Sequence, residues 1–192
     1  MKYLAFVWSV ICVCVTFPFL NEEERTLIYC DTRRWASFKG AAYNKKFFIS
    51  MFAESEEFRS VIYYRVRNRF RFLPSLFLKG QVACHLCMRK AGGGLLLIHG
   101  FSTIVCSDSV GENCTFHQNV TVGWSHGHAP VIGNNCVFGC GSIAIGNIKI
   151  GNNVIIGAGA VVTKDIPDNS VVIGNPCKIT PKKFTGDIMD YV

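Results

Sequence analysis

The second half of the chain repeats every six residues. An apolar residue opens each hexad, and a small or β-branched residue follows four positions later. The hexads begin at Val110, Phe116, Val122, Ile132, Phe138, Ala144, Ile150 and Ile156. A hexad is long enough for one short strand and one tight corner, so three hexads close a triangular coil of about eighteen residues. The spacing therefore predicts a parallel β-solenoid, with stacked strands roughly 4.8 Å apart and the first and fifth positions facing inward.

One long interruption marks where the solenoid opens into a loop. Ten residues separate Val122 from Ile132 instead of six, so four extra residues within 123–131 must leave the coil. Excursions from a rigid scaffold are common places for binding and catalysis. Before Val110 the pattern is weaker, with one extra residue between the hexads at Leu97 and Ile104. We expect the solenoid to run from about residue 81 to residue 173.

Several stretches of this region resemble the hexapeptide-repeat acyltransferases. They are Gly93–Gly100, Asn119–Gly123, Pro130–Gly133, Gly159–Pro167 and Gly174–Pro176. Within that family the chain is similar to the serine O-acetyltransferase-like branch, which also contains sugar and capsule O-acetyltransferases. The resemblance covers about half of the chain. It implies a left-handed parallel β-helix, a homotrimer, and acetyl-CoA bound between neighbouring subunits. The expected fold class is mainly β, a left-handed parallel β-helix of hexapeptide repeats with an N-terminal helical region.

Three domains are expected: an N-terminal helical region over 1–80, the β-helix over 81–178, and a C-terminal tail over 179–192. Residues 3–20 are nearly all apolar, about the minimum length of a membrane span. Lys2 before them resembles the start of a signal peptide, but no Ala-x-Ala cleavage site follows. Three interpretations stay open: a helix buried in the helical region or in a trimer contact, a membrane-inserted anchor, and a cleaved signal.

Two further helices are predicted in the N-terminal region. Asn21, followed three residues later by Glu24, is a capping-box pattern that indicates a helix over roughly residues 22–37. Helical apolar spacing over residues 57–72 indicates another, strongly basic helix. Its arginines are Arg59, Arg65, Arg67, Arg69 and Arg71. This cluster is either a surface for anionic lipid head groups or an ordinary solvated face. No groove-reading motif accompanies it, so we expect no nucleic-acid partner.

The ten cysteines do not indicate a secreted disulfide scaffold. Cys114 and Cys136 fall on the inward fifth position of their hexads, where a small apolar side chain fits. Cys84 and Cys87 have a metal-like spacing, but no second pair completes a zinc site. We therefore expect a reduced, cytoplasmic chain with no metal cofactor. Association with the inner face of a membrane is the further expectation, because of the apolar segment and the basic helix.

Acetyl transfer from a thioester to a hydroxyl needs a base, an oxyanion donor and a clamp for the coenzyme. His99 precedes Gly100 and matches the catalytic histidine of the family pattern, which implies that it is the general base. His126 and His128 lie in the looped-out segment, and we expect them to help bind the acceptor. His117 is expected to line the same cleft.

The last coils carry the residues that the resemblance implies for acetyl-CoA, the expected co-substrate. They are Gly157, Ala158, Gly159, Thr163, Lys164, Asn175 and Lys178. The three consecutive small residues leave backbone groups open to the pantetheine arm. Lys164 is placed for a phosphate of the nucleotide, with a solvent-facing lysine as the alternative. Cys177 replaces the Ala that is usual in the closing turn.

Three departures from the serine acetyltransferase pattern favour a different acceptor. An Asp that precedes the catalytic His in that pattern is Ile98 here, and a second Asp, fifteen residues upstream, falls at Cys84. The Gly-Asp-Arg-His-Pro loop that holds the serine carboxylate is replaced by Ser-His-Gly-His-Ala-Pro over residues 125–130. Each loss removes a charged partner for a zwitterion, so we expect a sugar or polysaccharide precursor as the acceptor.

Three alternatives to this function stay open. Serine O-acetylation is the first, and a catalytically silent β-helical binding scaffold is the second. A zinc enzyme like the γ-type carbonic anhydrases is the third, although their pair of histidines five residues apart is missing here.

Overall fold

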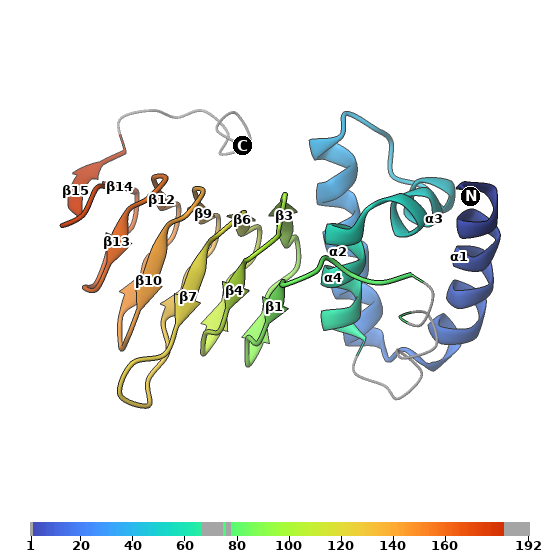
Figure 1. Cartoon of the computed structure of the whole chain (residues 1–192), viewed down its shortest axis with the longest axis horizontal. Helices are drawn as coiled ribbons and strands as arrows, with labels where there is room; N and C mark the ends of the chain where they lie inside the picture. The colour runs from blue at the N-terminus through green and yellow to red at the C-terminus, as the bar shows by residue number, and fades with distance from the viewer. Residues whose placement is uncertain (1, 67–74, 76–77, 183–192) are drawn as a thin grey trace.

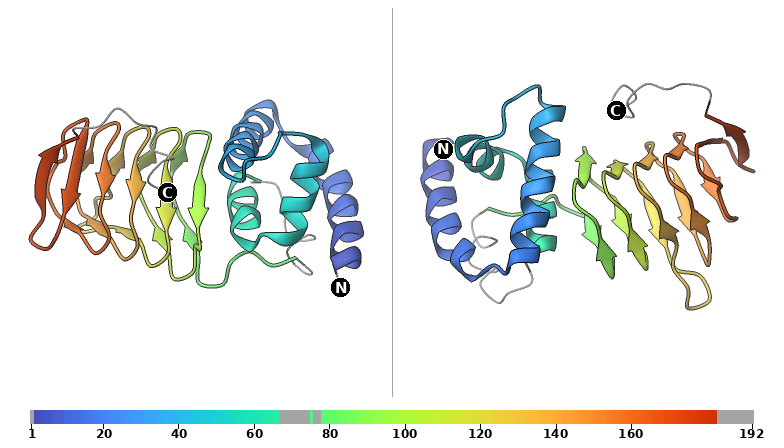
Figure 2. Two further views of the ribbon diagram at one scale, coloured as in Figure 1. Left: turned by 90° about the horizontal axis from the view of Figure 1, so that it is seen from above. Right: turned by 180° about the vertical axis from the view of Figure 1, so that it is seen from behind.

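The computed structural model describes residues 2–66, 75 and 78–182. A group of helices precedes a long β-solenoid, and the two regions join end to end along the long axis of the molecule (Figures 1 and 2). The helices are α1 Lys2–Thr16, the 3-10 helix η1 Phe17–Phe19, α2 Glu22–Phe38, α3 Lys45–Glu54 and α4 Glu56–Arg65. The helices α2 and α4 pack on the first coil of the solenoid.

Side-chain caps set the starts of these helices. The capping box predicted before α2 is confirmed: Glu24 N–H donates to Asn21 Oδ1 (2.8 Å), and Asn21 N–H donates to Glu24 Oε2 (3.0 Å). Asn44 caps α3, a helix that was not predicted. Ser55 caps α4, which ends at Arg65 because Val66 is extended. The helix expected over 57–72 is therefore too long, and residues 67–72 lie outside the described part of the chain.

The apolar first helix packs on one side only. α1 has fifteen residues and lies against α3, with Ser9, Cys12 and Thr16 buried. Its opposite face exposes Leu4 and Ile11, among other apolar side chains. Among the described helices, none is both long and apolar enough to span a membrane. Packing within the helical region thus accounts for one face of α1, and membrane association stays a prediction.

Two arginines of the predicted basic cluster are buried and are not part of an open surface. Arg65 donates to both carboxylate oxygens of Asp31 (2.8 and 3.1 Å) and to the carbonyls of Ala91 and Gly92. Asp31 also accepts hydrogen bonds from the backbone N–H groups of residues 94 and 95. The lipid-surface interpretation is wrong for this arginine, because it joins the helical region to the first coil.

Arg59 is buried in the same way, within the helical region. Its guanidinium donates to the carbonyls of Phe52, Ala53 and Lys79. Arg67, Arg69 and Arg71 lie outside the described residues.

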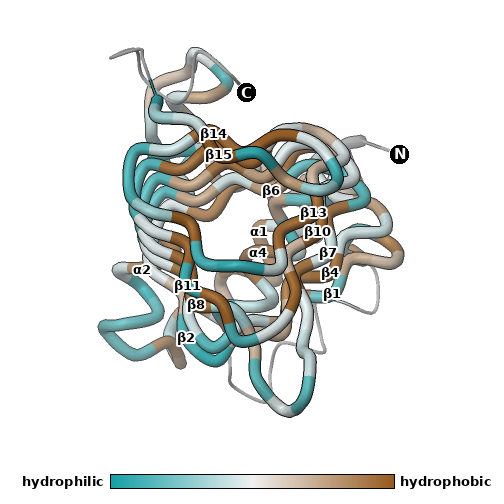
Figure 3. Tube along the Cα trace, turned by 90° about the vertical axis from the view of Figure 1, so that its left-hand side faces the viewer, coloured by the Kyte–Doolittle hydropathy of each residue, from teal (hydrophilic) through white to brown (hydrophobic). Residues whose placement is uncertain are grey.

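The solenoid has three parallel sheets, one on each side of a triangular coil (Figure 3). The first sheet contains β1 His85–Leu86, β4 Ile104–Val105, β7 Thr121–Gly123, β10 Ile143–Ile145 and β13 Val161–Val162. The second contains β2 Lys90–Ala91, β5 Ser109–Val110, β8 Val131–Ile132 and β11 Lys149–Ile150. The third contains β3 Leu96–Ile98, β6 Thr115–His117, β9 Val137–Phe138, β12 Ile155–Ile156, β14 Ser170–Ile173 and β15 Lys178–Pro181. Only β15 pairs antiparallel in these sheets, closing the end against β14. The predicted parallel β-solenoid is confirmed.

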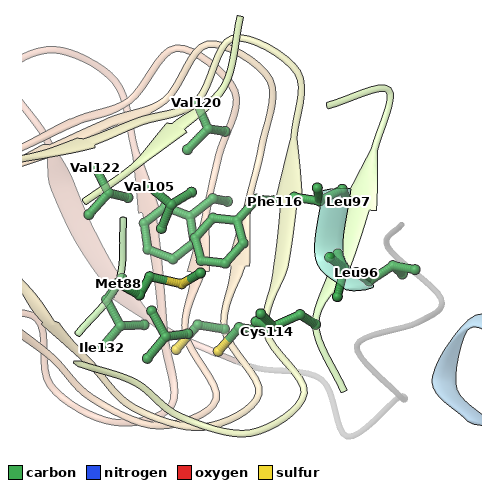
Figure 4. Packing of buried hydrophobic residues seen from close by; sticks show 14 of the residues in the cluster. Met88, Leu96, Leu97, Val105, Cys114, Phe116, Val120, Val122 and Ile132 are labelled. Carbon is green, nitrogen blue, oxygen red and sulfur yellow. The ribbon is translucent and has the colours of Figure 1, made fainter. Parts of the chain in front are cut away.

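Apolar side chains from successive coils stack in the interior (Figure 4). Phe116 and Phe138 stack with ring centroids 4.9 Å apart. The predicted inward position of Cys114 and Cys136 is confirmed, since both are 0% exposed. Their thiols donate to backbone carbonyls, Cys114 to Gly133 (3.2 Å) and Cys136 to the carbonyl one coil further on. These two cysteines are therefore core side chains.

Candidate active site at two edges of the solenoid

The strand order places the predicted site residues along two separate edges of the solenoid. The histidine edge comprises the corners from the third sheet to the first, with His99 and His117 at its first coils and residues 157–159 further on. The loop edge comprises the corners from the first sheet to the second, with residues 124–130 and 163–164. The first sheet separates the two edges. One chain therefore does not bring all of the predicted site residues together.

His99 lies on an unusually wide corner of the histidine edge. Eight residues separate the starts of β3 and β4, whereas six separate β6 from β7. His99 follows β3 directly, is exposed, and has a positive φ of 50°. Gly100, the next residue, is buried, and a Cβ there would lie 3.4 Å from Leu97 Cβ and 3.8 Å from Glu57 Cγ. These are ordinary van der Waals distances, so the corner at Gly100 is packed against Leu97 and Glu57.

His117 lies beside His99 on the neighbouring coil. The register pairs Ile98 of β3 with His117 of β6, which brings the two imidazoles into electrostatic contact. Burial lowers the pKa of His117, and the charge of His99 lowers it further. His117 is therefore neutral at neutral pH, which limits the positive charge around His99.

A pocket of about 600 Å³ opens next to His99, between the helical region and β3. Its polar groups come from the helices: Lys39, Glu54, Ser55 and Glu57. Aromatic side chains of α2 and α3 line it as well. None of these residues was predicted as part of the site, because only the packing of α2 and α4 on the first coil, and of α3 on α4, brings them to His99. The sequence carries no local pattern that links them to the histidine.

The loop edge carries a folded hairpin. Ser125 and His128 exchange backbone hydrogen bonds (2.9 and 3.1 Å), with His126 and Gly127 at positive φ in the turn. Ser125 Oγ also contacts His126 Nδ1 (2.8 Å). The hairpin projects from the solenoid beyond β7, as the yellow loop in Figure 1 shows. His126 and His128 are exposed there, away from the pocket that His99 lines in the same chain.

The residues predicted for acetyl-CoA also divide between the edges. Ala158 and Gly159 are exposed on the histidine edge, and no atom lies within 4 Å of a Cβ placed on Gly159. That corner lies three coils from His99, a separation of about 14 Å. The exposed residues Asn175 and Lys178 flank the last corner of this edge, whereas Thr163 and Lys164 lie on the loop edge. An open corner suits an extended pantetheine arm.

The described ranges contain no group of three or more His, Cys, Asp or Glu side chains placed to hold a metal ion. Cys84 and Cys87 are both free thiols.

Comparisons with known proteins identify the repeat and its branch. The family described as bacterial transferase hexapeptide (six repeats) matches residues 129–164. Serine acetyltransferase of Synechococcus elongatus is 37% identical over 95 residues, covering 47% of this chain and 39% of that protein. Chloroplastic serine acetyltransferase 1 of Arabidopsis thaliana is 43% identical over 95 residues, covering 47% of this chain and 30% of that protein. This chain carries hexapeptide repeats and is similar to serine acetyltransferases over about half of its length. Its matches span less than half of these curated relatives.

Solved structures of this branch share the fold. Neisseria gonorrhoeae serine acetyltransferase superposes with a TM-score of 0.70 at 20% identity, covering 100% of this chain and 82% of that one. Brucella abortus serine acetyltransferase in complex with coenzyme A gives a TM-score of 0.63 at 23% identity, covering 84% and 69%. The likeness establishes the predicted left-handed β-helix of hexapeptide repeats with N-terminal helices.

Proposed function

We propose that this chain transfers an acetyl group from acetyl-CoA to the hydroxyl of L-serine, with His99 as the general base. The observation that carries the proposal is the position of His99 on a pocket with charged groups of both signs, in a chain whose curated relatives are serine acetyltransferases. The sugar acceptor was favoured because the family's charged partners for serine are missing at Ile98 and in the loop. The helical region supplies other charged groups at the same place.

The chain's own residues account for the proton transfers. His99 takes the proton of the acceptor hydroxyl as that oxygen forms its bond to the acetyl carbon, and it returns the proton to the departing sulfur when the carbon–sulfur bond breaks. A neutral His117 beside it avoids a second positive charge while His99 holds the proton. When bound, acetyl-CoA supplies the activated thioester. We expect residues 157–159, with Asn175 and Lys178, to hold its pantetheine arm along the histidine edge.

We also infer that the chain works as a homotrimer with sites shared between subunits. In one chain the first sheet separates His99 from His126, His128 and Lys164. A site that uses both edges needs the histidine edge of one copy and the loop edge of the next. Closed cyclic symmetry makes three such sites in a trimer.

A sugar acceptor is the second candidate, and the composition of the pocket favours it. Three aromatic side chains, Trp35, Phe38 and Phe47, line a pocket of about 600 Å³, which is large for serine and adequate for a sugar. Ile98 next to His99 offers a sugar an apolar contact. The exposed apolar face of α1 would then hold the enzyme at a membrane where glycans are assembled.

An acceptor panel decides between the two candidates. Thiol release from acetyl-CoA is measured with L-serine, with free and nucleotide-linked sugars, and with no acceptor. We expect serine to be acetylated at least tenfold more efficiently than any sugar, and product masses must show O-acetylserine. Robust transfer to a sugar with serine inert selects the second candidate. Release of CoA that no acceptor accelerates contradicts both.

A further inference from the structure

Glu57 is the acidic side chain that the helical region brings against the His99 corner. It is half-buried in the first turn of α4, and its Cγ lies 3.8 Å from the Cβ position of Gly100. Burial raises the pKa of the neighbouring Cys84 thiol to about 11, and the charge of Glu57 contributes to that shift. These contacts locate the carboxylate between the first coil and the pocket.

The Glu57 carboxylate has spare hydrogen-bonding capacity. Its Oε2 accepts from Ser55 Oγ (3.0 Å), and within the described residues it forms no ion pair. Arg59 is a nearby cation, but its guanidinium donates to three backbone carbonyls. A half-buried carboxylate with a free oxygen is a strong acceptor for a charged donor, because such hydrogen bonds are roughly twice as strong as neutral ones.

Lys39 provides the opposite charge from a different helix. It is the C-cap residue that follows α2, and its Nζ lies 5.4 Å from the ring centroid of Phe38 at the pocket. The side chain is exposed and forms no ion pair with Glu57 in the described part of the chain. The pocket beside His99 therefore presents one cation, Lys39, and two carboxylates, of which Glu57 contacts the His99 corner; neither carboxylate forms an ion pair with Lys39 in the described part of the chain.

We propose that Glu57 and Lys39 are the specificity residues for an amino-acid acceptor: Glu57 binds its α-ammonium and Lys39 its carboxylate, which places the hydroxyl at His99. This assignment rests on the proposed acetylation of serine. It replaces the charged partners that Ile98, Cys84 and the altered loop lack, using side chains of the helical region. A neutral sugar has no charged group that could pair with either side chain.

The test compares three acceptors that differ only in their charged groups. L-Serine carries both, ethanolamine lacks the carboxylate, and 3-hydroxypropanoate lacks the ammonium. For Glu57→Gln we expect KM to rise about 10–100-fold for serine and for ethanolamine, and to stay unchanged for 3-hydroxypropanoate. For Lys39→Met we expect a rise of about 3–10-fold for serine and 3-hydroxypropanoate only, because an exposed lysine is screened by solvent. In both variants kcat and the KM for acetyl-CoA should change less than threefold.

Two matched variants control for charge and folding. Glu56→Gln removes the same charge one residue away, and Lys46→Met removes a lysine in the first turn of α3; both side chains are exposed, and neither lines the pocket. We expect wild-type KM values for all three acceptors in these controls. Each variant's thermal unfolding is compared with that of the wild type.

The possible outcomes distinguish a failure of the residue assignment from a failure of the proposed serine acetylation. If Glu57→Gln weakens all three acceptors equally, or leaves serine unchanged, the residue has a structural role and the assignment is wrong while serine acetylation stands. If the wild-type protein acetylates neither serine nor its two analogues, the proposed function itself fails, and the assignment fails with it. Glu57→Asp should recover part of the affinity for serine, whereas a purely steric role predicts no recovery.

Discussion

The β-helix and the helical region of this molecule are stabilised by different kinds of contact. In the β-helix, each side chain packs on its counterpart in the next coil, so neighbours in space are separated by one coil in sequence, as Phe116 and Phe138 are. In the helical region, stability depends on particular partners far away in the chain, such as Asp31 with Arg65. Proteins built from repeats behave as quasi-one-dimensional stacks, whereas the helical region behaves as an ordinary globular unit. The β-helix carries His99, the candidate general base, and the helices form most of the pocket beside it.

Replacing His99 tests whether the β-helix alone carries the chemistry. We expect His99→Ala to lower turnover by about 10²–10⁴, because the acceptor hydroxyl loses its base. The affinity for acetyl-CoA, measured by calorimetry, should stay nearly unchanged, since residues 157–159 lie three coils away. Turnover near the wild-type level would transfer the role to His117, the imidazole next to it.

Mixing inactive chains tests whether the two edges act across subunits. One chain carries His99→Ala, and the other carries His126→Ala with His128→Ala. If each site combines the histidine edge of one copy with the loop edge of the next, every trimer that contains both chains should keep one of its three sites intact, about one third of the wild-type number. The two chains are co-expressed with different tags, and double-purified complexes are assayed. A mixture no more active than its parents would show that the site lies within one chain.

Substitutions at two ion pairs, one in each region, compare how much each pair contributes to the free energy of unfolding. Asp31→Asn removes one partner of the buried pair with Arg65, which we expect to cost about 3–5 kcal/mol in the free energy of unfolding. The matched control is Asp108→Asn, which breaks the exposed pair with Arg89 between two coils (3.1 Å; side chains 37% and 70% exposed). That change should cost about 0–1 kcal/mol. Denaturant titration measures both, and equal losses would contradict the distinction between the regions.

The same difference explains how far the sequence could be interpreted. The hexads predicted the solenoid and the buried thiols of Cys114 and Cys136, because a fixed period repeats one local environment. The capping box at Asn21 predicted the start of α2 for the same reason, since both of its partners lie within one turn. The burial of Arg65 was not predicted, because its hydrogen-bond partners Asp31, Ala91 and Gly92 are 26 to 34 residues away in sequence.

The candidate site divides in the same way. His99 could be found from its place in the repeat, whereas Glu57 and Lys39 could not, because helix packing alone brings them to the pocket. The loop histidines were correctly located on an excursion of the solenoid. Whether they lie near His99 depends on which sheet separates their corner from the His99 corner. That can be known only when the register of every coil is known.

The smallest expected effect concerns Lys164, on the loop edge of the last complete coil. Its side chain is exposed, so an attraction to a phosphate of acetyl-CoA is screened by solvent and by salt, with a Debye length of about 10 Å at 0.1 M ionic strength. Lys164→Ala should therefore raise the Kd for acetyl-CoA by only about two- to fivefold at low salt, and less as salt increases. The control is Lys149→Ala, which replaces an exposed lysine on the second sheet. It should leave unchanged both the Kd for acetyl-CoA at low salt and the dependence of that Kd on salt. Calorimetric titrations at several salt concentrations give both Kd series. A weakening that does not depend on salt would mean that Lys164 acts through packing, and the loop edge would then have no electrostatic part in holding the coenzyme.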